Sequence, residues 1–403
     1  MTTTVLAFGH LPKFHGGRQQ SGLANAMWAI ATNMADSDTS FSVAFCATDV
    51  FAKSIRSGGL TVLGWTKTAL LAGMLRAPLR SFGLVGRMIG PCWKYRLPLL
   101  RTALRALHLQ QALARIEPDY LHLHGCESVA LLDAGVFDPA NTIVTIHGMF
   151  GKAGPQNLCE MEQALNRQPL RLLAFVSSKI GKEWRETFGR PAPHVEVIPN
   201  AFDRQAFFLA KGEAKQKGGV KGIYRLVTVG SVCDRKGQNR VVEAILRLKS
   251  SGAPYEVDFT MIGSSVPEED AGDLVRQAAN AGVAVHHIPY LSPSELRDQL
   301  RLADFMILPA SNEGFGLVFL ESIACGVPVV LPKELPICDE PDLISAANAV
   351  LLESASADAV FTFLASLPEH SFLDTTVAGS LPDGSWQDVG ARYRSLLAGP
   401  FKG

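Results

Sequence analysis

Residues 303–331 read ADFMILPASNEGFGLVFLESIACGVPVVL, and the pattern of this stretch decides the fold class. Apolar runs of strand length, a glycine loop and a helical repeat of apolar residues follow one another in it. In chain order, the strand, the loop, the helix and the second strand are expected at 305–308, 314–316, 317–324 and 327–331. This alternation predicts one α/β unit.

Two glutamates bracket the glycine loop. Glu313 immediately precedes Gly314, and Glu321 shares a helical face with the apolar Leu317. A carboxylate on the packed side is costly unless it accepts hydrogen bonds, and a sugar diol supplies two donors. The loop and the helix start behind it suit phosphate groups. The pattern therefore indicates a ligand with phosphates and sugar hydroxyls; the alternative is a surface glutamate and a salt-bridged one.

The same stretch carries a family resemblance. Residues 313–316 (EGFG), Glu321 and residues 324–330 (ACGVPVV) resemble the E-x7-E signature of the retaining glycosyltransferases of family 4, including those of lipopolysaccharide and cell-envelope type. The resemblance implies the α/β GT-B fold, in which two Rossmann-like domains face each other across a cleft. It also implies a nucleotide-sugar donor, retention at the anomeric carbon and no obligatory metal.

Composition is that of a soluble globular protein. The 403 residues are 47% hydrophobic and 19% charged with zero net charge, so nothing global argues for nucleic acid. The seven cysteines are scattered without a C-x-x-C pair, which indicates reduced thiols in the cytoplasm and no zinc cluster. The N-terminal residues lack a signal-peptide pattern, and no apolar run reaches the length of a membrane span.

The first residues predict a strand, a glycine loop and a helix, at 3–8, 16–17 and 21–34. The loop is not a G-x-G-x-x-G dinucleotide motif. The resemblance implies that Gly16 and Gly17 lie against the donor diphosphate and the acceptor; the alternative is a flexible loop. The D-x-D at 36–38 resembles a metal motif of another fold but falls in a turn, which favours a solvated turn.

Residues 50–116 contain no acidic side chain. The basic residues there are Lys53, Arg56, Lys67, Arg76, Arg80, Arg87, Lys94, Arg96, Arg101, Arg105 and Arg115. Tryptophan, phenylalanine and leucine are interleaved with them, which in a helical stretch suits an interfacial element on anionic lipid. The alternatives are a patch for the nucleotide or an anionic acceptor, and ordinary helices with a core side and a solvated basic side.

Two short apolar strands end in His-Gly, at His124 and at His147. Ligands of open α/β sheets bind at the carboxyl ends of strands, so two histidines there favour a functional role over a structural one. The family resemblance assigns His147 to the donor sugar and leaves His124 as an acceptor-side candidate. No H-E-x-x-H or third ligand supports a metal site.

A domain boundary is expected after residues 195–203 (VEVIPNAFD). This segment resembles the step that closes the first domain of the family, with Ala201 in place of the usual glycine, and Asn200 is a secondary site candidate. Residues 211–221 are rich in lysine and glycine, as linkers are. The domains are expected at 1–205, with a helix at 386–403 packing back on it, and at 222–385.

The second domain opens with a strand at 224–229, a loop and a helix from about residue 241. The loop holds Gly230, Ser231, Arg235 and Lys236, and the two cations suit a diphosphate that gains charge as the sugar leaves. The family usually places arginine directly after the first glycine, where this chain has Ser231. A solvated basic loop is the alternative.

Further along, Ser292 and Glu295 have capping-box spacing, and the resemblance implies that backbone near Tyr290 and Leu291 cradles the base. After Leu331 the family's Gly-Gly-x-x-Glu segment is absent, which leaves the choice of sugar open. The resemblance is strong in 224–331 and 195–203, moderate in 1–34 and 118–150, and absent in about 50–116.

The sequence thus predicts a cytoplasmic, metal-independent glycosyltransferase that moves a sugar from a UDP- or GDP-sugar to a glycan or glycolipid in envelope polysaccharide synthesis, without a cofactor. Peripheral membrane association through 50–116 is part of this expectation. Alternatives are a GT-B nucleotide-sugar epimerase and a non-catalytic binding protein. Chemistry is expected from Glu313, His147, Lys236 and Arg235. Donor contacts are expected from Gly16, Gly17, Gly230, Ser231, Arg235, Lys236, Tyr290, Leu291, Glu313, Gly314, Phe315, Gly316, Leu317 and Glu321.

Overall fold

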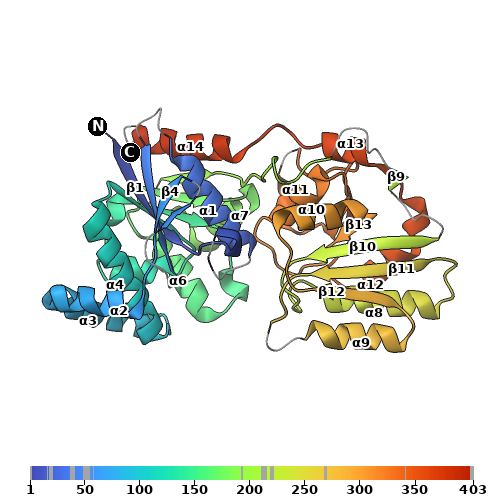
Figure 1. The fold of residues 1–403 in the computed structure, drawn as a ribbon, viewed down its shortest axis with the longest axis horizontal. Coiled ribbons are helices and arrows are strands. Elements are labelled where there is room, and N and C mark those ends of the chain that lie inside the picture. Colours follow the sequence, from blue (N-terminus) through green and yellow to red (C-terminus); the bar gives the residue numbers. More distant parts are fainter. Residues whose placement is uncertain are drawn as a thin grey trace. The chain divides into compact units, whose positions relative to one another are not determined.

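The structure is a computed structural model of the chain (Figure 1). It describes residues 2–15, 17, 21–36, 41–48, 55–57, 59–191, 194–209, 216–217, 222–266, 270–340 and 342–399. The chain divides into two compact units. Unit 1 is Met1–Asn200 with Trp386–Gly403, and unit 2 is Ala201–Ser385.

Unit 1 is built on an eight-stranded sheet of order β3-β4-β2-β1-β5-β6-β7-β8, parallel except for the β3–β4 pair. Its strands are β1 Thr3–Gly9, β2 Phe41–Ala47, β3 Ile55–Ser57, β4 Leu60–Leu63, β5 Tyr120–His124, β6 Thr142–Ile146, β7 Leu172–Phe175 and β8 Val195–Val197. Its α-helices are α1 Gly22–Met34, α2 Lys67–Arg76, α3 Pro78–Lys94, α4 Leu99–Ile116, α5 Ser128–Asp133, α6 Gln156–Asn166, α7 Ser178–Phe188 and α14 Trp386–Ala398. Short 3-10 helices lie at Lys13–His15, Pro139–Asn141 and Gly151–Ala153.

The central strands of unit 1 are apolar because both faces of the sheet are covered. In β1 the residues from Val5 onward are buried, and all of β6 is buried. The strand order runs outward from β1 in one direction and from β5 in the other. Such a reversal is the point of an open α/β sheet where ligands bind, at the carboxyl ends of the two strands. The residues after Gly9 and after His124 lie at this point.

The C-terminal helix α14 belongs to unit 1 and lies along α1 (Figure 1). Gly390 allows the close approach, because a Cβ atom there would lie 2.0 Å from the carbonyl oxygen of Asn33. Tyr393 is fully buried, and its hydroxyl lies 2.8 Å from Thr145 Oγ1 on β6. The last helix is therefore an integral part of the core of unit 1.

Unit 2 is built on a six-stranded parallel sheet of order β12-β11-β10-β13-β14-β15. Its strands are β10 Ile223–Val229, β11 Glu256–Ile262, β12 Ala284–Ile288, β13 Phe305–Ile307, β14 Val329–Pro332 and β15 Ala349–Leu352. Its α-helices are α8 Gln238–Ser250, α9 Ala271–Asn280, α10 Pro293–Leu302, α11 Leu317–Ala324, α12 Ala357–Ala365 and α13 Asp374–Gly379, with 3-10 helices at Pro336–Asp339 and Leu367–Glu369. Figure 1 shows α8, α9 and α12 on one face of the sheet and α10 and α11 on the other.

The reversal of strand order in unit 2 lies between β10 and β13. The expected strand, loop, helix and strand of residues 303–331 are present as β13, a loop, α11 and β14. The capping box of Ser292 and Glu295 at the start of α10 is confirmed. The two loops that the sequence singled out follow β10 and β13, so the fold brings them to one ligand-binding edge.

Residues 50–116 are more varied than the expected helical stretch. A short hairpin, β3 and β4, precedes the helices α2, α3 and α4. The apolar residues interleaved with the cations fall into a buried set and an exposed set, because each helix turns one side toward the core and the other toward solvent. Leu70, Leu84, Met88 and Tyr95 are buried, whereas Leu71, Leu75, Leu79, Phe82, Ile89, Trp93 and Leu100 are exposed.

The chain passes from unit 1 to unit 2 between Asn200 and Ala201, a few residues before the predicted linker at 211–221. Within 211–221 the structure describes β9 (Gln216–Lys217), which pairs with β16 (Phe372–Leu373) in a two-stranded antiparallel sheet. Gly16 and residues 37–38 of the D-x-D lie outside the described residues. All seven cysteines are free thiols. Among the described helices, none is long and apolar enough to cross a membrane.

Candidate functional site

The loop after β10 approaches its neighbours closely. Gly230 has a φ of +140°, and a Cβ atom there would lie 3.3 Å from Lys236 Cε. The buried amide of Gln238 holds the loop, since its Nε2 donates to the carbonyl oxygen of Ser231 at 3.2 Å and its Oε1 accepts from the Cys233 N–H at 3.3 Å. Lys236 is thereby fixed close to the backbone at the end of β10.

The loops after β10 and β13 meet through charge. Lys236 Nζ forms an ion pair with Glu313 Oε2, and both side chains are mostly buried. Arg235 Nη1 lies 3.9 Å from the same oxygen and donates to the carbonyl oxygen of Asn312 at 2.8 Å. Three predicted site residues therefore form one cluster. Its two cations face a single carboxylate, which leaves net positive charge for an anionic ligand.

The glycine loop and the start of α11 lie next to this cluster. Gly316 is the N-cap of α11 with φ +76°, and no side chain caps the helix there. A Cβ atom at Gly316 would lie 2.5 Å from the ring of Phe319, which itself is buried. Phe315 and Leu317 are also buried, whereas Gly314 is partly exposed. The backbone N–H groups of the first turn are thus available to an anion.

Glu321 lies on α11, partly buried. Burial raises the pKa of its carboxyl to about 7, and the nearby Asp203 carboxylate contributes to the same shift. Among the described residues no side chain or backbone group donates a hydrogen bond to this carboxyl. Asp203 itself accepts from the backbone N–H groups of Gln205 and Ala206. The Glu321 carboxyl is therefore an acceptor without a donor among the described residues, and its binding of a diol stays a prediction.

The remaining predicted residues of unit 2 lie on the same edge. Gly230 and Ser231 form the β10 loop. Tyr290 and Leu291 follow β12, and both are partly buried between that strand and α10. Both residues follow directly on the carboxyl end of β12, so the sheet brings them to this edge.

In unit 1, the two predicted histidines are in contact. His124 Nδ1 lies 3.0 Å from His147 Nε2, at the ends of β5 and β6. Burial lowers the pKa of His147 to about 4, and burial together with the neighbouring histidines lowers the pKa of His124 well below its usual value. Both imidazoles are therefore neutral near pH 7, and His147 can exchange hydrogen bonds with a sugar hydroxyl without carrying charge.

Two further predicted site residues of unit 1, Gly17 and Asn200, lie among backbone or buried groups. Gly17 packs on the backbone of Leu11, because a Cβ atom there would lie 1.8 Å from the Leu11 carbonyl oxygen, and its N–H donates to the Pro12 carbonyl. Asn200 is buried, and its Oδ1 has no hydrogen-bond partner among the described residues. The Asn200 side-chain oxygen could therefore still accept a hydrogen bond.

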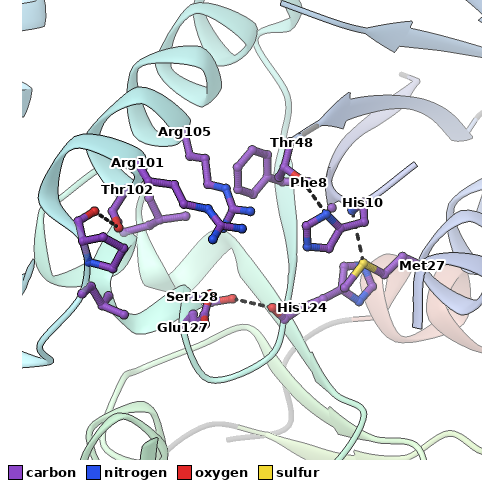
Figure 2. Close-up of a pocket in the computed structure, with 14 residues that line it drawn as sticks. Phe8, His10, Met27, Thr48, Arg101, Thr102, Arg105, His124, Glu127 and Ser128 are labelled. Atoms are coloured by element: carbon purple, nitrogen blue, oxygen red, sulfur yellow. Dashed lines mark hydrogen bonds between the residues drawn. The ribbon is translucent and has the colours of Figure 1, made fainter. Parts of the chain in front are cut away.

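Sequence reasoning missed several residues around these sites. Gln238 and Asp203 act on the cluster and on Glu321 from positions whose contacts only the fold reveals. His10 could have been found, because it follows the glycine that ends β1, just as His124 and His147 lie at ends of strands. His10, Thr48, Arg101 and Arg105 line a cavity of about 170 Å³ beside His124 (Figure 2).

Two protein-family models match parts of this chain. Residues 70–206 match the family model described as Glycosyltransferase Family 4, and residues 211–360 match the one described as Glycosyl transferases group 1. A D-inositol 3-phosphate glycosyltransferase of an Arthrobacter species is 34% identical over 145 residues, which are 35% of this chain and 34% of that protein.

A second relative is a GDP-mannose-dependent alpha-(1-6)-phosphatidylinositol monomannoside mannosyltransferase of Mycolicibacterium smegmatis. It is 26% identical over 57% of this chain and 62% of its own length. The chain thus spans less than two thirds of the length of these curated relatives.

Two solved structures share the fold across the chain. The alpha,alpha-trehalose-phosphate synthase of Burkholderia xenovorans has a TM-score of 0.67 at 16% identity, covering 98% of this chain and 100% of that one. The sucrose-phosphate synthase of Thermosynechococcus elongatus has a TM-score of 0.65 at 13% identity, covering 98% and 99%. The predicted GT-B fold is confirmed.

Proposed function

We propose that this chain, which carries the two domains of a GT-B glycosyltransferase, moves a sugar from a nucleoside diphosphate sugar to a glycan or glycolipid acceptor. The observation that carries the proposal is the cluster of Arg235, Lys236 and Glu313 at the point where the strand order of unit 2 reverses. A donor diphosphate is the ligand that this combination of cations, glycine loop and helix start suits best.

In the proposed reaction the cations stabilise the leaving group. Charge develops on the departing diphosphate, and Lys236 and Arg235 would receive it together with the N–H groups at the start of α11. Lys236 is paired with Glu313 in the structure, so a diphosphate that binds Lys236 would replace one anionic partner by another. These cations would do what a divalent ion does in other glycosyltransferases, which makes the reaction metal-independent.

The other predicted residues receive roles consistent with their surroundings. Glu321 would accept hydrogen bonds from the ribose diol, and Glu313 and the neutral His147 would face the transferred sugar. Retention at the anomeric carbon is proposed from the family resemblance, and the sequence itself names no nucleophile for the far face of the sugar. Stabilisation of the leaving group would therefore supply most of the catalysis.

The acceptor is proposed to be a polyol or glycolipid of the cell envelope. The names of the two relatives contain an inositol 3-phosphate and a phosphatidylinositol monomannoside, and one of them is described as GDP-mannose-dependent. A lipid-linked acceptor would also account for the exposed apolar side chains of α2 and α3, which lie among basic residues. We place these helices against the anionic inner face of the cytoplasmic membrane.

The proposal is tested by calorimetric titration of the purified protein with UDP, GDP, ADP, CMP and their sugar conjugates, without added metal. One nucleoside diphosphate should bind, and saturation at a hundredfold excess over Kd should stabilise the protein by about 2.7 kcal/mol. Lys236→Ala should weaken this binding and lower transfer to acceptor by about 2–4 kcal/mol of transition-state free energy.

The matched control is Lys249→Ala, an exposed lysine on α8 of the same unit. It should leave nucleotide binding and turnover unchanged. Nucleotide binding without any transfer or hydrolysis would favour the binding-protein alternative. Equal affinity of wild type and Lys236→Ala for every nucleotide would remove the cluster from the donor site and the proposal with it.

A further inference from the structure

The cavity of unit 1 lies where ligands of an α/β sheet are expected. It is bordered by the end of β1 (Phe8, Gly9), by His124 at the end of β5, and by the first turns of α4. The strand order of unit 1 reverses between β1 and β5, so the cavity occupies the position in unit 1 that the charged cluster occupies in unit 2.

We propose that this cavity binds a phosphate group carried by the acceptor, with Arg101 and Arg105 as its ligands. The proposal deepens the proposed function, on which it rests, by naming the chemistry of the acceptor. That phosphate would belong either to a soluble polyol phosphate or to a phospholipid headgroup, and the test below separates the two sources.

The first support is charge. Arg101 and Arg105 are one turn apart on α4, so both side chains leave the same helical face. Figure 2 shows both reaching from α4 toward the cavity. No salt bridge is formed by Arg101 with any described residue, and the one acidic residue among those lining the cavity, Glu127, is exposed. Converging guanidinium groups are the common protein ligands of a phosphate.

The second support is the start of α4. Pro98, its N-cap, offers no side-chain hydrogen bond to the first turn, and Leu97, Pro98 and Thr102 line the cavity with the arginines. The N–H groups of this first turn have no partner inside the helix, and the helix dipole adds partial positive charge at the same place. An anion beside the arginines would satisfy both.

The third support is a buried polar atom without a partner. His124 lines the cavity, and its Nε2 has no hydrogen-bond partner among the described residues. Nearby, Thr48 Oγ1 lies 2.9 Å from His10 Nδ1, and Ser128 Oγ donates to the His124 carbonyl oxygen at 3.1 Å. The arginine side thus suits a phosphate, whereas the histidine side suits the hydroxyls of a polyol attached to it.

The position of His124 suggests what binding of this phosphate would do for the acceptor. His124 contacts His147, the residue proposed to face the transferred sugar. A phosphate held by the arginines would place the hydroxyls of the acceptor beside this histidine pair. Arg101 and Arg105 are therefore specificity-determining residues of the acceptor and take no part in the chemistry of the donor.

The test measures binding of glycerol 3-phosphate, with glycerol as the uncharged comparison, to full-length protein carrying Lys236→Ala. That substitution weakens phosphate binding at the cations of unit 2, of which Arg235 remains. Glycerol 3-phosphate should bind, and Arg101→Gln and Arg105→Gln should each weaken it about tenfold or more. Arg101→Lys should retain part of the affinity. Arg185→Gln, an exposed arginine on α7 of unit 1, is the matched control and should change nothing.

A second arm uses vesicles of phosphatidylcholine with and without phosphatidylinositol, and glycerophosphoinositol as a soluble competitor. Loss of binding to phosphatidylinositol vesicles in the arginine variants, with competition by glycerophosphoinositol, identifies a lipid headgroup. Arginine-dependent binding of glycerol 3-phosphate alone identifies a soluble polyol phosphate. Binding that is independent of both arginines in both arms overturns the proposal. Nucleotide affinity of Arg101→Gln in the otherwise natural chain should equal that of wild type, so failure here is distinguishable from failure of the donor site.

Discussion

Glu321 is the residue whose ionisation bears most directly on donor binding. Because burial raises the pKa of its carboxyl to about 7, the group is about half protonated at neutral pH. A carboxylate accepts stronger hydrogen bonds from a diol than a carboxylic acid does. We expect the affinity for the UDP- or GDP-sugar that binds best to rise severalfold between about pH 6 and about pH 8.

Calorimetry across this range measures the effect, since the sugar-bearing diphosphate does not itself titrate there. Glu321→Gln should bind the nucleotide sugar more weakly and with the same affinity at every pH. Glu295→Gln, which removes an exposed carboxyl from the start of α10 in the same unit, should keep the wild-type profile. If the affinity of wild type and of Glu321→Gln changed with pH in the same way, Glu321 would not contact the ribose.

At the residue scale, motif spacing was informative where the residues of each loop are close together in the sequence. Arg235, Lys236 and Glu313 were all chosen from sequence, and the fold brings them together. Asp203 and Gln238 were not chosen as site residues, because their importance comes from contacts across the fold: a carboxylate near Glu321 and an amide beneath the β10 loop. A single sequence carries no signal for such contacts.

The element with the most unusual surface is α3. Leu79, Phe82, Ile89 and Trp93 recur at helical spacing on its outer face, and Leu79 and Trp93 are 89% and 86% exposed. Arg76 at the end of α2 and Arg80 lie beside them. Apolar side chains set among cations on an outward face are the arrangement of an interfacial helix.

We therefore expect binding to vesicles containing phosphatidylglycerol, measured by sedimentation. Arg76→Gln with Arg80→Gln should weaken it by about 1 kcal/mol per residue at low salt and less at high salt. Phe82→Ser with Trp93→Ser should weaken it at any salt concentration. Phe208→Ser, which removes an exposed phenylalanine from unit 2, is the control. Unchanged sedimentation of both double variants would make α3 an ordinary solvated helix.

Elements with a strong period were predictable, and short ones were not. The helices at 21–34 and 317–324 and the strands around them were expected close to their observed bounds. The β3–β4 hairpin was missed because its strands are only a few residues long and lie in a basic, glycine-containing stretch. Arg87 was counted with the other cations of this stretch; its side chain is exposed, and its Nε also donates to the carbonyl oxygen of Ala134 at 2.8 Å, a contact that the sequence did not predict.

At the scale of the whole molecule, the order of strands was the information that the sequence did not contain. Alternating strands and helices indicated two α/β units, but only the fold shows that each sheet reverses its order at the loops carrying candidate residues. The return of α14 to unit 1 was expected from the family resemblance alone. Its physical basis is the close approach at Gly390 and the buried hydroxyl of Tyr393, neither of which a local pattern reveals.

The buried histidines of unit 1 and Glu321 of unit 2 should respond to acid in opposite senses. In unit 1, burial lowers the pKa of His108 and His147 to about 4 and that of His122 to about 3. The unfolded chain binds protons on these histidines from about pH 6.5 downward, whereas the folded unit does not. The stability that neutral histidines confer is therefore complete above about pH 6.5 and is lost as the pH falls toward 4.

In unit 2, the Glu321 carboxyl has a raised pKa, so the folded unit binds its proton more readily than the unfolded chain does. That group destabilises the fold as the pH rises through the interval from about 4.5 to about 7, and acidification relieves it. Scanning calorimetry at about pH 7.5 and about pH 5 should show the unfolding transition of unit 1 moving to lower temperature relative to that of unit 2. His122→Asn, which removes one buried imidazole, should reduce the shift, and the exposed His194→Asn should not. Transitions that move together in wild type would mean that the buried histidines do not control the acid response, since each unit of pKa difference is worth about 1.4 kcal/mol and the displacement of unit 1 should be plain.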